Sequence, residues 1–408
     1  MKRFLALVAL LGAGILSSPA APPDPALRFF EDKVKADPDD LTAQNQLAER
    51  YLAKLRETGR LEWLPKARAA ADASLHSVPG ELNFGGLLAS ARAALAEHRF
   101  AEAARLAQQY TETRPQTAAG WETLFDARLE LGTYPEAKVA LDHLSASGAD
   151  AVSLGSRQAL WARLHGEDAA APLDAALAGA REMSVKHPQP GLLAWCLTQR
   201  GEIAFLTGDF STAEKLYAEA LSTVPGDWRA QSHLAELRAA EGKFDEALAL
   251  LNKTIEDTGR PELLQAAGDV ELARQRPDAA KPWHDRALAA YQASLARGEK
   301  LYTHHLAGFY CDSQPQPAEA VRLARADLAE RGSIQAHAAL AWALHLDGQL
   351  EAAAKEATLA LATGTKDSHL LYQAGLIFTA AGDLPRGRAA LRAAEEANPR
   401  RASFHFHR

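Results

Sequence analysis

The stretch Gly208–Leu221 reads GDFSTAEKLYAEAL, and it recurs with variations along the chain. Clear copies begin at Gly242, Gly348 and Gly382, and each carries a turn residue followed five positions later by a small residue. Fainter copies begin at Glu62, His98, Gly132, Gly166, Gln275 and Pro315. One short unit that recurs at a nearly constant spacing indicates an array of repeats.

The small residue in each copy gives the period of the array. A second small residue precedes most of these residues by twelve positions, as Gly201 precedes Ala213. Two amphipathic helices can approach to about 8–10 Å where such small side chains meet. The pattern therefore predicts one pair of antiparallel helices in each period. The small residues lie 33 to 42 positions apart and are Ala67, Ala103, Ala137, Ala171, Ala213, Ala247, Ala280, Ala320, Ala353 and Gly387.

These residues resemble the tetratricopeptide repeat family. In the repeat that starts at Ala194, the family's large, small, aromatic and proline positions are matched in order by Leu197, Gly201, Ala213, Tyr217, Ala220 and Pro225. About ten such repeats cover Leu41 to Pro399. The resemblance implies an all-α fold, a right-handed superhelical solenoid of antiparallel helix pairs in which each repeat buries its apolar face against its neighbours.

Some repeats depart from the family's pattern. Arg238 and Glu271 stand where an aromatic residue is usual. Three intervals between small residues, of 36, 42 and 40 positions, exceed the others. We therefore expect longer loops or helices near Thr58, His187 and Arg297.

The first twenty residues have the features of an export signal. Lys2 and Arg3 precede the apolar run Phe4–Leu16, and Ser18-Pro19-Ala20 offers small residues for cleavage. Residues 1–20 are therefore predicted to be a signal peptide, and the protein to be secreted or periplasmic. The alternative is an uncleaved anchor, although the run is shorter than the roughly 20 residues that a membrane span needs.

The remaining chain divides into three parts. Residues 21–40 are predicted to be an extended segment followed by a lone helix at 26–36, which acts as an N-terminal half-repeat. The solenoid of about ten repeats occupies residues 41–399, and residues 400–408 form a C-terminal tail.

The charge excludes two classes of partner. The chain has 45 Lys and Arg against 52 Asp and Glu, a formal net charge of −7. Loss of residues 1–20 removes Lys2 and Arg3 and no acid, so the charge of the mature chain is −7 − 2 = −9. Nucleic acid and anionic membrane surfaces are therefore not expected partners, and we expect no stable membrane insertion after cleavage.

The sequence offers no catalytic motif. H-E-x-x-H, G-x-S-x-G, C-x-x-C and a Gly-rich phosphate loop are all absent. We therefore predict that the protein is not an enzyme and that it holds no cofactor. Cys196 and Cys311 lie three repeats apart, farther than the Cα separation of about 7 Å that a disulfide allows. We expect each to be a small buried residue.

Histidine is the abundant polar residue type that needs an explanation, with 14 copies. His405 and His407 form an H-x-H pair in the tail, which could supply two metal ligands if the segment is extended. The simpler interpretation is a frayed chain end, and we assign no metal site. His304 and His337 occupy a position that packs between helices, so we expect them to be partly buried and hydrogen-bonded.

The inner surface distinguishes one repeat protein from another. In the resembled family, five positions of each first helix line the concave face. In the middle repeats these positions hold Trp195, Glu202, Phe205, Arg229 and Glu236, and in the early repeats Arg92, Glu122, Asp126 and Arg163. The last three repeats present aromatic and imidazole side chains, which we predict to bind a partner: Tyr302, His305, Phe309, Trp342, His345, His369 and Tyr372.

An alternative register remains open for this surface. A shift by one residue would turn Phe309 and Trp342 toward the neighbouring helix instead of the groove.

The sequence favours an exported, non-enzymatic scaffold that binds a protein or peptide partner in its concave groove. Two alternatives remain. One is an envelope component of a polysaccharide or protein export assembly, and the other is a metal-binding or glycan-binding repeat protein that uses the histidine and aromatic surface.

Overall fold

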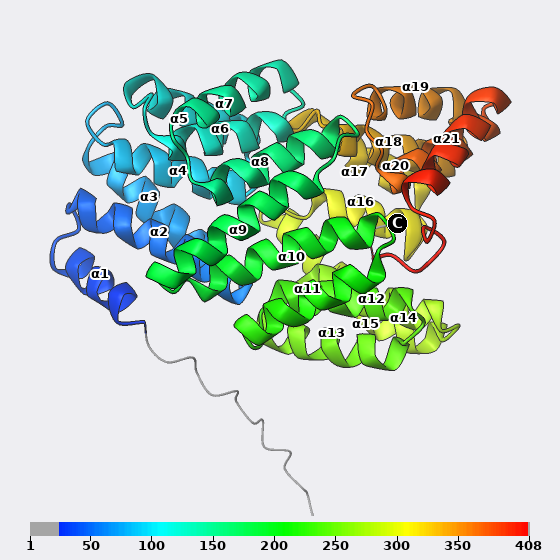
Figure 1. The fold of residues 1–408 in the computed structure, drawn as a ribbon, viewed down its shortest axis with the longest axis horizontal. Coiled ribbons are helices and arrows are strands. Elements are labelled where there is room, and N and C mark those ends of the chain that lie inside the picture. The colour runs from blue at the N-terminus through cyan, green and yellow to red at the C-terminus, as the bar shows by residue number, and fades with distance from the viewer. Residues whose placement is uncertain (1–23, 407–408) are drawn as a thin grey trace, which may run out of the picture.

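The computed structural model describes residues 24–406, and these residues form 21 α-helices and no β-strand (Figure 1). The predicted signal peptide, residues 1–20, lies outside the described residues, as does His407 of the predicted H-x-H pair. None of the helices among residues 24–406 is both long enough and apolar enough to span a bilayer. The helices follow one another in antiparallel pairs, as the repeat pattern predicts.

A single helix, α1 (Pro25–Ala36), precedes ten helix pairs. The pairs are α2 (Leu41–Thr58) with α3 (Trp63–Ser77), α4 (Phe84–Ala96) with α5 (Phe100–Thr113), α6 (Ala118–Glu130) with α7 (Tyr134–Ala146), α8 (Ala151–Leu164) with α9 (Ala170–Lys186), α10 (Pro190–Leu206) with α11 (Phe210–Thr223), α12 (Trp228–Ala240) with α13 (Phe244–Thr258), α14 (Pro261–Ala273) with α15 (Pro277–Ala296), α16 (Thr303–Asp312) with α17 (Pro317–Glu330), α18 (Ile334–Leu346) with α19 (Leu350–Ala360), and α20 (Ser368–Ala380) with α21 (Leu384–Ala397).

The pair α10 and α11 shows why the quoted stretch folds this way. Gly208 ends the first helix with φ 84°, a backbone conformation that glycine adopts without a steric cost. The Asp209 side chain then accepts a hydrogen bond from the amide of Thr212 and caps the second helix. A Cβ on Gly201 would lie 2.5 Å from the ring of Tyr217, so the two helices can cross only because Gly201 has no side chain. Tyr217 is fully buried at this crossing.

Small residues mark the crossings in nine of the ten pairs, since nine of the ten predicted marker residues are buried. The prediction is wrong at Ala171, which is exposed. In that pair, α8 and α9 cross at Gly155 and Ala176, where a Cβ on Gly155 would lie 3.1 Å from the Cβ of Ala176. The helix α9 begins at Ala170, four positions after the turn residue Gly166, whereas α11 begins two positions after Gly208. Ala171 therefore lies in the first turn of α9, before the crossing.

Long helices end at the three expected places, which confirms that part of the expectation, but the interval of 36 positions from Ala67 to Ala103 lies after α2 and contains the loop of residues 78–83 instead. The long helices are α2 with 18 residues, α9 with 17 and α15 with 20. In the intervals of 42 and 40 positions, the inserted residues therefore lengthen helices that run past their partners, and the order of the pairs is kept.

Segments about 200 residues apart in the sequence also lie against each other. We call this region of contact the seam. Its first side comprises residues 56–60, 129–134 and 161–166, and its second side comprises residues 228–229, 257–260, 331–338 and 360–370. The first and second halves of the solenoid are therefore packed together as well as connected through the intervening repeats.

Polar and apolar contacts both contribute to the seam. The amide of Ile334 donates to the hydroxyl of Tyr134 at 2.8 Å, and the guanidinium of Arg331 lies 3.2 Å from the Glu130 carboxylate. Leu164 and Ile334 belong to one buried apolar cluster. The backbones approach closely at Gly132, where a Cβ would lie 2.0 Å from the carbonyl oxygen of Gly332.

Candidate functional site

A cavity of about 450 Å³ opens on the inner side of the solenoid. Its walls come from the first helices of seven successive pairs, α8 to α20, and from residues 404–406 of the tail. Every wall residue outside the tail lies on such a first helix, with the single exception of Asp367, which caps α20. The cavity is therefore the concave channel that tandem helix pairs create.

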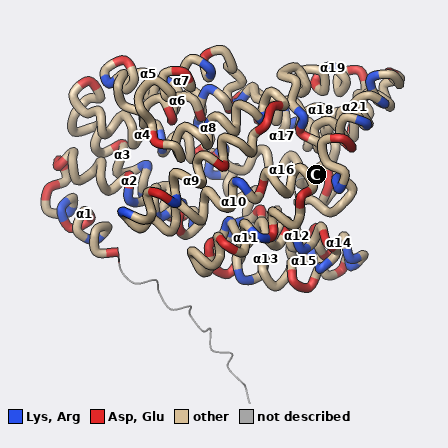
Figure 2. The backbone as a smooth tube through the Cα atoms, viewed as in Figure 1, with Lys and Arg blue, Asp and Glu red and all other residues tan. Residues whose placement is uncertain are grey.

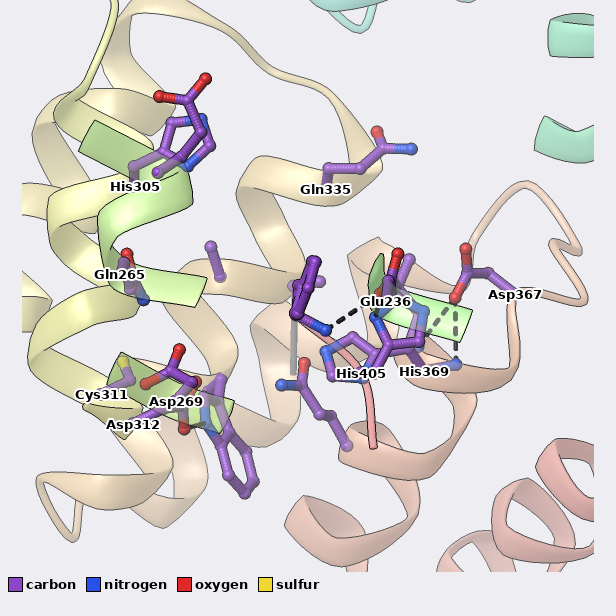
Figure 3. Close-up of a pocket in the computed structure, with 18 of the residues that line it drawn as sticks. Glu236, Gln265, Asp269, His305, Cys311, Asp312, Gln335, Asp367, His369 and His405 are labelled. Carbon is purple, nitrogen blue, oxygen red and sulfur yellow. Dashed lines mark hydrogen bonds and ion pairs between the residues drawn. The ribbon is translucent and has the colours of Figure 1, made fainter. Parts of the chain in front are cut away.

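The charge of this channel is unbalanced. Its wall holds one guanidinium, that of Arg163, and no lysine, against six carboxylates. Figure 3 shows polar side chains on two sides of the cavity, with Asp269 and Asp312 on one side and Asp367 and Glu236 on the other. Over the whole fold, by contrast, basic and acidic residues are interspersed in the view of Figure 2. The six carboxylates belong to Glu202, Glu236, Glu262, Asp269, Asp312 and Asp367.

Arg163 pairs with one of these carboxylates across the seam, that of Asp367, and with a second, that of Glu202, on the neighbouring first helix. Its guanidinium lies 3.0 Å from Asp367 and 3.4 Å from Glu202. Burial would raise the pKa of Asp367, but Arg163 outweighs that effect and keeps the pKa below its usual value. Asp367 also caps α20 by accepting hydrogen bonds from the amides of His369 and Leu370. Asp367 is therefore held in its charged form at neutral pH.

The opposite wall is organised by hydrogen bonds between neighbouring repeats. Asp269 of α14 accepts a hydrogen bond from the Ser313 hydroxyl at 2.8 Å and lies 2.9 Å from Nε2 of His284. The Trp342 indole of α18 donates to Asp312 of α16 at 3.2 Å. These contacts fix the carboxylates of adjacent first helices relative to one another.

The C-terminal tail enters this channel. After α21 the chain turns back toward the middle of the molecule (Figure 1). Phe404 is buried, and both the amide of Phe406 and Nδ1 of His405 lie 2.9 Å from Oε1 of Glu236. The expectation of a frayed chain end is therefore wrong for residues 401–406. The cause is the buried Glu236 carboxylate, which gains two polar partners from this segment.

Residues before this point guide the tail into the channel. The guanidinium of Arg400 lies 4.7 Å from the ring centre of Phe210, and that of Arg401 lies 4.5 Å from the ring centre of Tyr372. Both are favourable contacts between a cation and an aromatic face. The tail thus contacts two separate repeats before it reaches Glu236.

The imidazole of His405 is surrounded by acidic groups. Burial disfavours its charged form, but Glu236 first, and then Asp367 and Glu202, outweigh burial and raise the pKa of His405 above its usual value. The ring also lies 5.4 Å from that of Phe205 and 6.2 Å from that of His369. The channel therefore favours a positive charge at this point.

Three of the seven residues predicted to bind a partner line the cavity: His305, Trp342 and His369. Two others do not, and the expectation that they face the groove is wrong. Tyr302 precedes α16 and packs on Tyr291, with 5.3 Å between ring centres, and Phe309 is fully buried against the rings of Tyr291 and His284. For Phe309, the alternative register is the one observed.

The last two predicted residues lie beside the cavity. His345 stacks on Trp342, with 5.2 Å between ring centres, and burial lowers the pKa of His345. Tyr372 is 36% exposed and contacts Arg401 of the tail. Partner binding by these residues stays a prediction.

Sequence reasoning missed an acidic group on α14. Glu262, Gln265 and Asp269 all line the cavity. They occupy the same inner positions in their repeat as Tyr302, His305 and Phe309 do in the next repeat. The rule that gave those three residues would therefore have found Glu262, Gln265 and Asp269 as well. The rule could not have found Phe404, His405 and Phe406, because the tail lies outside the repeats.

The other histidines and cysteines considered from the sequence are buried or partly buried. His304 and His337 are partly buried and lie 3.2 Å from Asp327 and 2.7 Å from Glu356, which confirms the expectation for both. Cys196 and Cys311 are buried and unbonded, and burial raises the pKa of each thiol to about 12. Within residues 24–406, no three His, Cys, Asp or Glu side chains are grouped as metal ligands.

The comparisons with known proteins agree with the repeat pattern. Residues 204–267 match the family model for the tetratricopeptide repeat, and no curated protein matches the chain. Similar solved structures include yeast Tom70 (14% identity, 88% of this chain and 85% of that chain, TM-score 0.40) and the human IFIT1 dimer with PPP-AAAA (12%, 92% and 95%, 0.44). A tetratricopeptide repeat protein from Parabacteroides merdae is another (15%, 64% and 93%, 0.37). Residues 204–267 therefore match the tetratricopeptide repeat, and helix pairs of the same kind recur through residues 24–406.

Proposed function

We propose that this protein is a non-enzymatic scaffold that holds an extended segment of a partner protein in its channel. One observation supports this proposal above the others. A segment of polypeptide, residues 404–406 of the chain itself, already lies in the channel and makes hydrogen-bonded contacts there. A channel that accommodates its own tail has the width and the polar groups that a peptide ligand needs.

The wall suits an extended backbone better than a compact small molecule. Glu236 accepts a hydrogen bond from a backbone amide, and further acceptors follow at intervals along successive first helices. Trp342 and Phe205 supply aromatic surface between these acceptors. The volume of about 450 Å³ that stays open beside the tail is within the range of about 300–1,000 Å³ of ordinary ligand sites. Peptide recognition in a groove commonly combines such backbone acceptors with pockets for side chains.

The location of the protein is part of the same proposal. The basic and apolar start of the sequence supports export across a membrane, so the partner would be met outside the cytoplasm. N-terminal sequencing of protein purified from its native host tests this. A mature chain that begins near Ala21 supports export, and an intact Met1 in a soluble cytosolic fraction would contradict it.

The channel can be tested by changing residues that line it. We expect the double variant Trp342→Ala and His305→Ala to lose most of the partner that the wild-type protein captures from the native host, because truncation of buried aromatic anchors typically costs about 2 kcal/mol or more. The measurement is quantitative mass spectrometry of the captured proteins. Trp283→Ala serves as the control, since Trp283 is also partly buried but lies on the second helix α15, outside the cavity wall. Equal capture by both folded variants and wild type would place the binding surface elsewhere.

A further inference from the structure

The tail presents a simple chemical pattern to the channel. Two phenylalanines, Phe404 and Phe406, lie on either side of His405. Phe404 joins the large buried apolar cluster that includes Leu306 and Phe309, and Phe406 packs against its edge. His405 meets the carboxylate of Glu236 between them. Each of the three side chains thus has a surface of matching character in the channel wall.

We infer that the channel selects an extended segment with a cationic side chain between two aromatic ones, and that Phe404-His405-Phe406 is a resident copy of this segment, which a partner displaces. This inference rests on the proposed function and names the chemistry of the partner. The tail then competes with a partner for the same site, and the partner can bind only when the tail has left the channel.

The charges around His405 set the central requirement. Glu236 of α12, Asp367 at the start of α20 and Glu202 of α10 surround the imidazole, together with the imidazoles of His369 and His233. Arg163 neutralises part of this acid by pairing with Asp367 and Glu202, but not with Glu236. Glu236 is 5% exposed, and a buried carboxylate is stable only with a cationic or hydrogen-bonding partner. The imidazole of His233 lies 4.0 Å from the other oxygen of Glu236, so a displacing segment has to replace the cation and the amide donor that the tail brings to Oε1.

The two aromatic positions differ in how much space surrounds them. Phe404 is 7% exposed and fills its place. Phe406 lines both the main cavity and a second cavity of about 250 Å³, whose wall includes Trp228, Arg229 and Ala266. A partner could place a residue larger than phenylalanine, such as tryptophan, beside this second cavity. The first aromatic position is therefore expected to be stricter than the second.

The tail is a covalently tethered occupant of the channel. Residues 404–406 are connected to α21, which ends at Ala397, through the six residues 398–403. A ligand tethered in this way has an effective concentration on the order of millimolar. An external segment must compete with that concentration. The wild-type channel should therefore bind a peptide more weakly than a channel from which the tail has been removed.

The test uses the full-length chain and a synthetic peptide. The first variant replaces Phe404, His405 and Phe406 by alanine and so vacates the channel. The probe is a fluorescein-labelled peptide with the sequence of residues 400–408, RRASFHFHR. We expect this variant to bind the peptide at least about tenfold more tightly than the wild-type chain does, measured by fluorescence anisotropy, because the tethered competitor is gone. Phe29→Ala, which removes an exposed phenylalanine of α1, is the matched control and should bind the peptide as the wild type does.

Two further comparisons define the chemistry of the interaction. In the vacated chain, Glu236→Gln should weaken peptide binding about tenfold, and so should alanine in place of histidine at the sixth position of the peptide, because each removes one side of the charged pair. Arginine at that position of the peptide should preserve binding. Circular dichroism checks that every variant keeps the helical signal of the wild-type chain.

Several outcomes would overturn the inference. One is equal binding of the peptide by the vacated and the wild-type chains, and another is equal binding of the native and the alanine-substituted peptides. The proposed function is tested separately by the capture experiment with the Trp342 and His305 variants. If capture depends on the channel but the vacated chain does not bind this peptide, the scaffold function stands and the resident-ligand inference fails.

Discussion

The inner surfaces of the early and late repeats are built on the same helix pairs but differ in charge. In the early repeats, acids are paired with guanidinium groups of an adjacent repeat: Glu49 lies 2.9 Å from Arg92, and Asp126 lies 2.7 Å from Arg157. In the late repeats, taken here as those from α10 to α20, six carboxylates line the cavity, and the single guanidinium of the wall, that of Arg163, comes from α8. The tail enters the late surface, where acid is in excess. Repeat packing thus sets where a groove forms, and the balance of charge along it sets what the groove can hold.

The largest loss of stability is expected for substitutions at the helix crossings, which are built in the same way in both regions. Gly201→Leu should destabilise the protein by about 1–3 kcal/mol, because even a Cβ at this position would lie 2.5 Å from the buried ring of Tyr217. The measurement is chemical denaturation followed by circular dichroism. Gly191→Leu in the same helix is the control, since no atom lies within 4 Å of a Cβ there. Equal stability of the two variants would contradict the crossing geometry.

The next largest loss of stability is expected for a substitution in the seam, which joins the early region to the late one. Gly132→Ala and Gly148→Ala both place alanine at φ near 70°, so both have a similar backbone cost of roughly 1 kcal/mol. The Cβ of an alanine at position 132 would meet the carbonyl of Gly332, whereas a Cβ at position 148 would face open space. We expect Gly132→Ala to lose about 1–2 kcal/mol more than Gly148→Ala in thermal or chemical unfolding. A difference near zero would mean that the two halves are not in contact in solution.

Much of this fold could be predicted from the sequence, because small residues at fixed spacing determine which helices can cross. The spacing gave the wrong residue at Ala171, because α9 begins later after its turn residue than α11 does and crosses α8 at Ala176. The seam was not predictable in the same way. Contacts such as Ile334 with Tyr134 join residues 200 positions apart, and they depend on how far the solenoid turns over six repeats. The repeat pattern reports only on neighbouring repeats.

The candidate site was predicted in part, because the pattern within each repeat indicates which residues of its first helix face inward. The inner positions correctly gave Glu202, Glu236 and Trp342 as wall residues. They failed at Tyr302, which precedes α16, and at Phe309, whose neighbour Gly308 lines the cavity instead, although His305 and Asp312 of the same helix do line it. The tail could not be placed, because 170 positions separate Phe406 from Glu236.

The smallest predicted effect is a change of tail docking with pH. It measures how strongly the excess of acidic groups in the late repeats acts on the tail. The pKa of His405 is raised in the folded chain above its usual value of 6.5. Its protonated form therefore stabilises the docked tail fully below about pH 6.5, and this contribution is lost as the pH rises through the raised pKa. Carbon-13 NMR of histidine-labelled protein, with His405→Gln to assign the signal, measures that pKa. Glu236→Gln should lower it, and a wild-type value at or below 6.5 would contradict the acidic surroundings described above.

Hydrogen exchange of the C-terminal segment, measured by mass spectrometry, tests the central claim of an occupied channel most directly. The amide of Phe406 donates to the buried Glu236, so the segment that contains residues 403–406 should exchange at least about tenfold more slowly in the native protein than in the isolated peptide of the same sequence. Glu236→Ala, which removes the acceptor, should abolish this protection while the helices α10 to α14 keep theirs. Exchange of the native tail at the rate of the isolated peptide would show that the channel does not hold it.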